Sequence, residues 1–218
     1  MADPASRLAE VRDGIAAACK LARRPPADVT LIAVAKGRTP EAIEPLITAG
    51  QIDFGENRVQ EAAAKWPDLR RHHPGIRLHM IGRLQSNKAE DAVALFDCIH
   101  SVDRPSLLQA LAKAADKLDR FPPVYIQVNI GAEEQKGGAG IDDLGDLVGL
   151  VRSSPLPLAG LMCIPPADTQ PGPYFALLAE LARRHDVTGL SMGMSADYRQ
   201  AVMMGATAVR IGSALFDD

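Results

Sequence analysis

The chain has 218 residues, of which 47% are hydrophobic and 23% charged, and this composition excludes a mainly disordered protein. At roughly 100 to 200 residues per domain, the length predicts one domain over residues 1–218. The 24 basic and 27 acidic residues leave a net charge of -3, so bulk charge offers no attraction for nucleic acid or an anionic membrane. We find no signal-peptide pattern and no apolar run of membrane-spanning length. We therefore expect a cytoplasmic monomer with no membrane or nucleic-acid partner.

The first predicted element is an amphipathic helix. Leu8, Val11 and Ile15 recur at the spacing of one helix face, with charged residues between them. We expect Pro25 and Pro26 to end this helix. The three cysteines of the chain are far apart and show no C-x-x-C pairing, which predicts reduced thiols and no disulfide.

Short apolar runs then alternate with helical stretches along the rest of the chain. The runs are apolar on both faces, which is typical of parallel strands covered by helices. Eight such units predict a single α/β domain, a (β/α)8 TIM barrel with an extra N-terminal helix. An open doubly wound sheet is the alternative, but the Gly-rich turn of a dinucleotide site is absent after the first strand. The expected strands are Val29–Lys36, Ile52–Glu56, Ile76–Gly82, Phe96–Val102, Val124–Asn129, Leu158–Ile164, Leu190–Ser195 and Ala208–Ile211, and the expected helices include Pro40–Ala49, Asn57–Trp66, Arg104–Leu118 and Pro173–His185.

One lysine lies where the first strand ends. The two-residue period of a strand puts Ile32, Val34 and Lys36 on one face, and if this face lines the barrel, Lys36 rises into its mouth. A partly desolvated lysine is available as a free amine for a Schiff base. A lysine that merely extends from a strand end into solvent is the other interpretation, and position alone does not decide between them.

The last two units carry the parts of an anion site. Ser195 follows the seventh strand, while Gly212 and Ser213 follow the eighth. Glycines that let backbone N–H groups approach a ligand, together with hydroxyl donors, form phosphate cradles, and TIM barrels commonly bind phosphate at this place. Turn formation alone is the alternative for either loop, but the two loops together favour an anion.

Two further strands carry polar residues at positions expected to be buried. Arg210 lies inside the eighth strand and needs an anionic or hydrogen-bonding partner there, either a structural carboxylate or a ligand atom. Tyr125, Gln127 and Asn129 share one face of the fifth strand, as a polar barrel lining or a hydrogen-bonded core layer. Asn57 follows the second strand and could be only a helix N-cap.

The spacing of the histidines and serines supports neither a metal site nor a serine hydrolase. The five histidines show no H-E-x-x-H or H-x-H pattern, so we predict no metal site. No G-x-S-x-G motif follows a strand, which argues against a serine hydrolase.

Eight blocks of the sequence, in order along almost the whole chain, resemble the pyridoxal phosphate homeostasis protein family, a single-domain relative of the N-terminal barrel of alanine racemase. The blocks are Ala33–Lys36, Phe54–Asn57, His79–Lys88, Ser101–Arg104, Val128–Ile130 with Lys136, Gly160–Pro165, Leu190–Ser195 and Val209–Gly212.

This resemblance implies a fold type III protein that holds pyridoxal 5′-phosphate (PLP) as a Schiff base on Lys36. It implies that the phosphate lies on the loops around Ser195, Gly212 and Ser213. Arg210 would face the pyridine nitrogen, and Asn57 would lie beside the ring. A cation opposite the nitrogen discourages ring protonation and weakens the cofactor as an electron sink. Lys136 matches a basic position of the family, whereas Gly37, Arg38, Arg58 and Arg83 depart from its pattern.

The expected function is PLP binding in vitamin B6 homeostasis without robust catalysis, with PLP-dependent apo-enzymes as candidate recipients. Barrel racemases use a tyrosine from a second domain as their second base, and the length of this chain leaves no room for such a domain. Two alternatives stay open at this stage. One is a small PLP-dependent racemase or lyase, and the other is a cofactor-free Schiff-base aldolase acting on a sugar phosphate.

Overall fold

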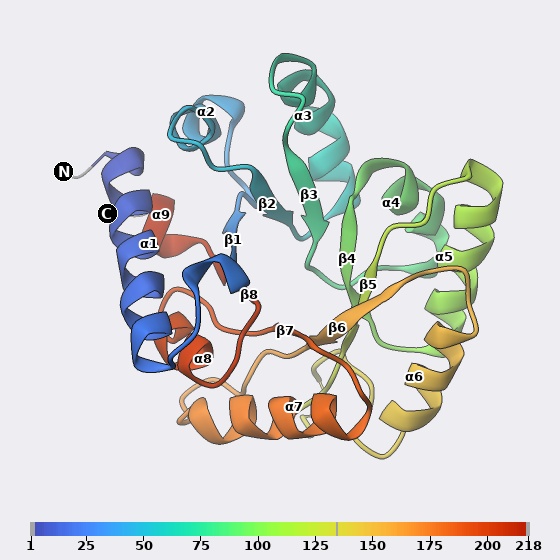
Figure 1. The fold of residues 1–218 in the computed structure, drawn as a ribbon. Helices are drawn as coiled ribbons and strands as arrows, with labels where there is room; N and C mark the ends of the chain where they lie inside the picture. The colour runs from blue at the N-terminus through green and yellow to red at the C-terminus, as the bar shows by residue number, and fades with distance from the viewer. Residues whose placement is uncertain (1–2, 134, 217–218) are drawn as a thin grey trace.

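Parallel strands close into a barrel in the order β1-β2-β3-β4-β5-β6-β7-β8 in the computed structural model, which describes residues 3–133 and 135–216 (Figure 1). The expected fold class is confirmed, and the doubly wound alternative is excluded because β8 pairs with β1. The strands are β1 (Thr30–Val34), β2 (Asp53–Glu56), β3 (Arg77–Met80), β4 (Cys98–Val102), β5 (Val124–Gln127), β6 (Leu158–Met162), β7 (Gly189–Ser191) and β8 (Ala208–Ile211).

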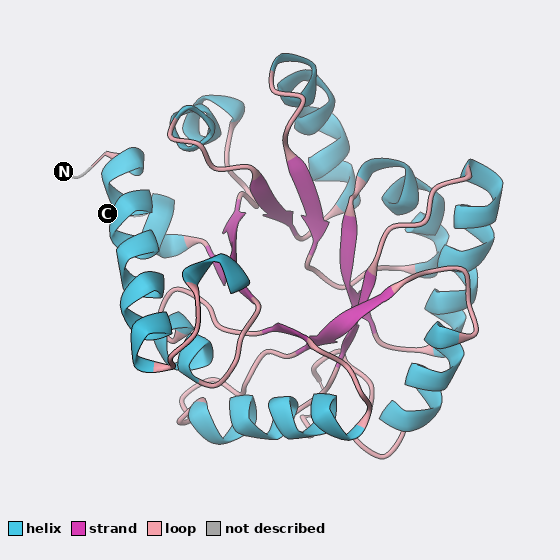
Figure 2. Cartoon of the chain, in the orientation of Figure 1, coloured by secondary structure: helices cyan, strands magenta, loops and turns pink. Residues whose placement is uncertain are grey.

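Helices form an outer ring around the strands (Figure 2). The extra helix α1 packs beside α8 and α9, on the side of the barrel where β8 meets β1 (Figure 1). None of the helices in the described ranges is long and apolar enough to cross a membrane. The helices are α1 (Pro4–Leu21), α2 (Pro40–Thr48), α3 (Val59–His72), α4 (Ala89–Leu95), α5 (Pro105–Leu118), α6 (Leu144–Arg152), α7 (Gly172–Arg184), α8 (Tyr198–Met203) and α9 (Ser213–Phe216), with short 3-10 turns η1 (Pro26–Asp28) and η2 (Ser86–Lys88).

Two elements end earlier than the sequence predicts. Helix α1 stops at Leu21, before the prolines, and Arg23 already has a positive φ of 55°. Strand β1 stops at Val34, because Lys36 and Gly37 form a turn in which Gly37 has a φ of 66°. Lys36 therefore lies on a turn and not on the strand itself.

The barrel interior contains both polar and apolar side chains, whereas the layer between strands and helices is apolar. Side chains alternate along each strand, so that Ile32 and Arg210, which pair in register on β1 and β8, face inward together. Large apolar side chains such as Phe54, Trp66 and Phe175 fill the outer layer and are fully buried. This outer layer supplies most of the hydrophobic stabilisation and leaves the interior free for polar groups.

An aromatic ring occupies the interior because two glycines leave room for it. Tyr125 stacks on His100 with ring centroids 4.3 Å apart. A Cβ at Gly160 would lie 2.4 Å from Cε1 of Tyr125, and a Cβ at Gly189 would lie 3.1 Å from the same atom. The polar face predicted for strand five is thus an interior face at this position.

Candidate functional site

The candidate site lies where the strands end, and Lys36 is one of its exposed cations. Lys36 is exposed and lies on the turn after β1, which pairs with β8 in register from Thr30 to Ala33. A Cβ at Gly212, just after β8, would have Cβ of Val34 at 3.5 Å as its nearest neighbour. The ends of β1 and β8 are therefore in contact directly below the turn that carries Lys36.

A buried lysine on α3 holds this turn in place. Nζ of Lys65 donates to the carbonyl oxygen of Ala35 at 2.7 Å and to that of Arg38 at 2.9 Å, so it bonds to both sides of Lys36. Its charge is balanced by Glu56 at the end of β2, whose Oε1 lies 2.7 Å away. Only 10% of the Lys65 side chain is exposed, which makes this a buried ion pair.

Glu56 is itself fixed by the outer apolar layer. The indole Nε1 of Trp66 donates to Oε1 of Glu56 at 2.9 Å, and the carboxylate is fully buried. Its other oxygen, Oε2, has no hydrogen-bond partner among the described residues. Glu56 and Lys65 therefore act as one anchor for the turn.

The predicted phosphate loops meet in the structure. Oγ of Ser195 accepts from the backbone N–H of Gly212 at 3.3 Å and from that of Ala214 at 3.2 Å. Gly193 turns the chain between β7 and Ser195 with a φ of 94°, where a Cβ would lie 2.5 Å from that of Ala201. Hydroxyl and amide groups from both loops thus converge, as an anion site requires, and Ser213 is exposed beside them.

Arg210 is buried in β8 and hydrogen-bonded by neutral groups. Nη1 donates to Oγ of Ser191 at 2.7 Å, and Nη2 donates to the carbonyl oxygen of Cys163 at 2.9 Å. Burial lowers the pKa of Arg210 from its ordinary value, and neighbouring Cys163 and Asp197 act in the opposite direction. Within the described ranges the hydrogen-bond partners of Arg210 are neutral, so the structural carboxylate, one of the two partners that the sequence left open, is not found among these residues.

Asn57 lies half-buried at the mouth and is not a helix cap. The N-cap of α3 is Arg58, without a side-chain hydrogen bond. A hollow of about 270 Å³ at the strand ends is lined by Asn57, Arg83 and Lys136 among others. Lys136 bonds to Glu133 at 2.6 Å, so it is a paired cation at the rim of this hollow.

A chain of polar side chains inside the barrel was not recognised in the sequence. Asp53, His79, His100 and Ser191 are joined by hydrogen bonds that end at Arg210. Each lies alone on a separate strand, so no spacing motif indicates them. Their inward positions in the two-residue strand period are the signal that could have done so.

Two members of this interior chain, Asp53 and His100, have shifted pKa values that indicate their charge. Burial alone would raise the pKa of Asp53, but hydrogen bonds from His79 and Arg77 bring it below its ordinary value. Burial, followed by the charges of His79 and Arg210, lowers the pKa of His100 well below 6.5. His100 is therefore neutral at physiological pH.

The histidines also lie close to a thiol. Ligand-capable atoms of His79, Cys98 and His100 lie within 4.8 Å of one another, a grouping that the spacing of the sequence did not show. Burial raises the pKa of Cys98 to about 12, and the ring nitrogens already bond to protein groups. The absence of a bound metal stays a prediction.

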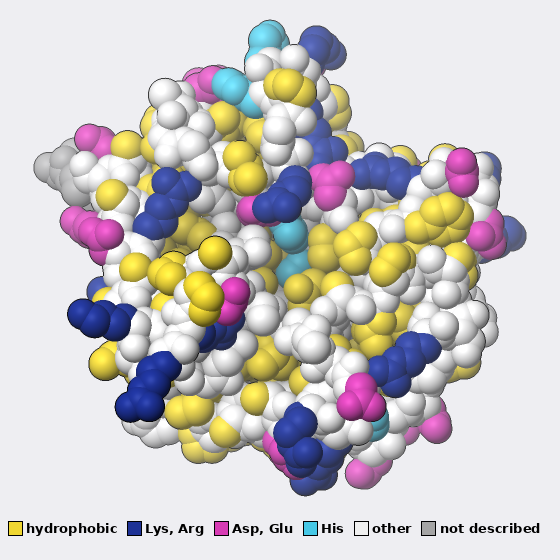
Figure 3. All heavy atoms as spheres, viewed as in Figure 1, with side chains coloured by type: hydrophobic (Ala, Val, Ile, Leu, Met, Phe, Trp, Pro, Cys, Tyr) yellow, Lys and Arg dark blue, Asp and Glu magenta, His cyan; other side chains and the backbone are white. Residues whose placement is uncertain are grey.

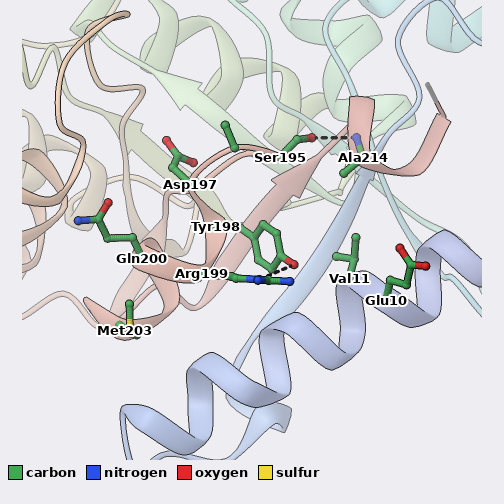
Figure 4. Close-up of a pocket in the computed structure, with 10 residues that line it drawn as sticks. Glu10, Val11, Ser195, Asp197, Tyr198, Arg199, Gln200, Met203 and Ala214 are labelled. Carbon is green, nitrogen blue, oxygen red and sulfur yellow. Dashed lines mark hydrogen bonds between the residues drawn. The ribbon is translucent and has the colours of Figure 1, made fainter. Parts of the chain in front are cut away.

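A separate hollow of about 540 Å³ lies between α1 and α8 (Figure 4). Figure 4 shows Ser195 and Ala214 at its edge, joined by their hydrogen bond, with Tyr198 and Arg199 across from Glu10 of α1. Neither Lys36 nor Arg210 lines it. This hollow therefore shares Ser195 with the predicted phosphate loops but does not include Lys36.

Comparison with known proteins identifies the family. The model of the alanine racemase N-terminal domain matches residues 7–218. The chain is 38% identical to the pyridoxal phosphate homeostasis protein of Escherichia coli K12, over 99% of this chain and 97% of that protein. It belongs to the pyridoxal phosphate homeostasis protein family. The protein of that name from Aquifex aeolicus is 38% identical over 97% of this chain and 96% of its own length.

Solved structures of family members share the whole fold. PipY of Synechococcus elongatus, solved without PLP, is 39% identical and superposes with a TM-score of 0.86 over 97% of this chain and 99% of PipY. PipY with PLP bound superposes with a TM-score of 0.85 over 98% of this chain. Alanine racemase of Clostridium difficile, 15% identical, has a TM-score of 0.70 over 93% of this chain and 54% of its own length, which shows the shared barrel alone.

Proposed function

We propose that this protein binds PLP at the mouth of the barrel and serves PLP homeostasis, with Lys36 as the covalent anchor. One observation carries the proposal: the exposed Lys36 follows β1, and β1 pairs with β8, the strand that contains Arg210. The residue after β8, Gly212, bonds to Ser195. The names of the family members and PipY with PLP bound support the same ligand. The six residues Lys36, Asn57, Ser195, Arg210, Gly212 and Ser213 form the proposed cofactor site.

The donor set of this mouth fits the chemistry of PLP. A phosphate needs amide and hydroxyl donors, which Gly212, Ala214 and Ser195 provide. Oγ of Ser195 accepts hydrogen bonds from both amides. A bound anion would replace Oγ as the acceptor of these amides, and the hydroxyl of Ser195 would then donate to the anion. Gly212 matters because a side chain there would fill the corner next to Val34.

The cations of the site have separate tasks. PLP supplies, when bound, an aldehyde that reacts with amines and a ring that withdraws electrons from an attached carbon. Lys36 supplies the amine. Arg210 cannot be deprotonated in a protein, so it can donate a hydrogen bond to the ring nitrogen without giving up a proton. In these roles Lys36 and Arg210 would hold the cofactor in place and would do little to promote reactions of bound amino acids.

The tyrosines favour a role without robust catalysis. Tyr125 is in the interior, stacked on His100, and burial raises its pKa to about 12. Tyr198 is buried and accepts a hydrogen bond from Arg199 at 3.2 Å, on the outer side of the barrel against α1. Tyr174 lies on α7. No tyrosine among the described residues thus follows a strand into the mouth, where the second base of a racemase would be needed.

The test is trapping of the cofactor on its lysine. Purified protein mixed with PLP should develop a visible absorbance band, and borohydride followed by peptide mapping should find phosphopyridoxyl on Lys36. Lys36→Ala should lose this label completely while it keeps weaker, non-covalent PLP binding through the phosphate loop. Lys113→Ala, which removes an exposed lysine on α5, is the matched control and should label fully.

Three outcomes would contradict parts of the proposal. Wild-type protein that shows neither band nor label after PLP is added would refute the cofactor. Label retained in full by Lys36→Ala would assign another anchor. Rapid turnover of an amino acid by the PLP-loaded protein would favour a racemase or lyase, and cleavage of a sugar phosphate without PLP would favour an aldolase. Transfer of PLP to apo-enzymes, the monomeric state and the cytoplasmic location stay predictions.

A further inference from the structure

A continuous chain of hydrogen bonds crosses the inside of the barrel and ends at Arg210. Oδ1 of Asp53 lies 2.9 Å from Nε2 of His79, and Nδ1 of His79 lies 3.0 Å from Nε2 of His100. Nδ1 of His100 lies 2.8 Å from Oγ of Ser191, which is 2.7 Å from Nη1 of Arg210. Strands β2, β3, β4, β7 and β8 each contribute one member, so the chain spans the barrel from wall to wall.

The two ends dictate the direction of every bond between them. An ionised Asp53 can only accept, so Nε2 of His79 donates to it. In a neutral imidazole the other nitrogen accepts, so His100 donates from its Nε2 to His79. Nδ1 of His100 must then accept from the hydroxyl of Ser191, whose lone pair is left for Arg210. With both histidines neutral, this is the one arrangement that satisfies all five groups.

The Asp53 end is reachable from the floor of the barrel, where the strands begin. A hollow of about 390 Å³ there is lined by Thr30, Gln51, Asp53 and Arg77 among others. The side chain of Arg77 is 56% exposed and bonds to Oδ2 of Asp53 at 2.7 Å. Figure 3 shows histidine side chains at the centre of the viewed face, beside basic and acidic ones. The Asp53 end of the chain therefore borders an open hollow, whereas Arg210 at the other end is only 4% exposed.

We propose that Ser191, His100 and His79 are positioning residues that orient Arg210 toward the ligand through a hydrogen-bond chain fixed at Asp53. The hydroxyl hydrogen of Ser191 is donated to His100, so Ser191 can only accept a hydrogen bond from Arg210. Stacking of Tyr125 holds the ring of His100 in the required plane, with 14° between the two rings. This inference deepens the proposed function and rests on it for the identity of the ligand above Arg210.

The same chain has a second state that one proton produces. With one proton added, the Nε2 proton of His100 passes to Nδ1 of His79, and the added proton ends on Nδ1 of His100. Nδ1 of His79 then donates to His100, and Nδ1 of His100 donates to Ser191. The oxygen of Ser191 now receives two donors, and its hydroxyl hydrogen must turn away. The ionisable groups around His79 and His100 are Asp53 on β2, Arg77 on β3, Cys98 on β4, Tyr125 on β5 and Arg210 on β8.

The experiment is a pH titration of cofactor-free protein with 15N-labelled histidine and arginine, observed by NMR. At about pH 8 we expect both interior histidines in the Nε2–H form, as the direction of the bonds requires. As the pH falls, the signals of His79 and of the Arg210 guanidinium should change with one shared midpoint. A role limited to packing would not link these two signals.

Variants separate the chain from general effects on the fold. Ser191→Ala should leave the titration of His79 in place but uncouple Arg210 from it, and Ser191→Thr should restore the coupling. His79→Gln should make the Arg210 signals independent of pH. His72→Gln, an exposed histidine on α3, is the control and should change nothing. Coupling that survives in Ser191→Ala, or His100 found as its Nδ1–H form at about pH 8, would overturn the proposal.

A cofactor readout distinguishes this inference from the proposed function. With PLP added, the visible band of Ser191→Ala should show a shifted pH midpoint relative to wild type, and Ser191→Thr should return it. If NMR shows the directional chain but no variant or wild type binds PLP, the proposed function fails and the chain stands. If PLP binds but Arg210 does not follow His79, the chain is refuted and the cofactor remains.

Discussion

Strands β1 and β8 lie side by side, yet they hold the two cations of the site in opposite ways. Lys36 is exposed on a turn, and the protein fixes it indirectly, through the carbonyl groups on either side that bond to Lys65. Arg210 is inside its strand, 4% exposed, and is fixed directly by side-chain and backbone acceptors. In the role proposed for Lys36 its side chain must reach a ligand, so only its backbone can be anchored. A permanent cation can be buried once its donors are satisfied.

The largest effect should come from breaking the anchor of the β1 turn. Lys65→Met leaves the carboxylate of Glu56 buried without its cation, and losing one partner of a buried ion pair costs about 3–5 kcal/mol. We expect that loss in urea unfolding of the cofactor-free protein, together with slower labelling of Lys36 by PLP. Lys113→Met on α5 is the matched surface control. If Lys65→Met unfolds at the wild-type urea concentration, the buried pair is not an anchor.

Removal of the buried cation on β8 should cost less. Arg210→Met removes the side-chain donor of the Cys163 carbonyl, whereas Oγ of Ser191 keeps its bond to His100, so we expect the loss of one buried hydrogen bond, about 1–3 kcal/mol. No charged partner is stranded, in contrast to Lys65→Met. Urea unfolding measures the difference between the two variants, and a loss for Arg210→Met larger than that for Lys65→Met would reverse the comparison.

The pH dependence of stability should report the neutral histidine beneath Arg210. Burial, His79 and Arg210 hold the pKa of His100 well below 6.5 in the folded chain. In the unfolded chain it titrates near about 6.5, so below that pH only the unfolded state takes up this proton. The free energy of unfolding should therefore fall with decreasing pH, by about 1.4 kcal/mol per pH unit from this group.

His100→Gln should flatten that slope. Urea unfolding at about pH 6.5 and about pH 5.5 measures it in both proteins, and His72→Gln should keep the wild-type slope. Equal slopes in wild type and His100→Gln would show that His100 is protonated in the folded protein as well.

The smallest effect should come from the rim of the site. Ser195→Ala removes the hydroxyl that joins Gly212 and Ala214, groups that are partly open to solvent. We expect PLP affinity to fall about fivefold, equal to about 1 kcal/mol, with little change in stability. Ser195→Thr keeps a hydroxyl and should bind as wild type does. Unchanged affinity of Ser195→Ala in an absorbance titration would place the phosphate elsewhere.

Much of this architecture could be predicted from the sequence because it depends on local pattern. Short apolar runs at regular intervals predict the barrel, and the fixed geometry of a barrel then places Lys36, Ser195 and Gly212 at one mouth. The end of β1 was predicted two residues late, because a turn residue and a strand residue look alike when both follow an apolar run.

Contacts between distant residues were not predictable in the same way. Lys65 on α3 has the pattern of an exposed helical lysine, and only the fold brings it to the turn after β1. Asp53, His79 and His100 are single polar residues on different strands, so their hydrogen bonds appear once the strands are in register. Propensity and spacing act within a segment, whereas these contacts are set by the closure of the barrel.

Two glycines let β6 and β7 approach each other closely beside Tyr125. Gly160 and Gly189 have no side chains where the ring lies, and a Cβ at Gly189 would also lie 2.0 Å from the carbonyl oxygen of Ala159. An alanine at either glycine would push the ring toward His100 or separate β6 from β7. A Cβ at Gly160 would likewise lie 2.3 Å from the carbonyl oxygen of Gly189, so a smaller residue at Tyr125 would not by itself make room for a side chain at either glycine.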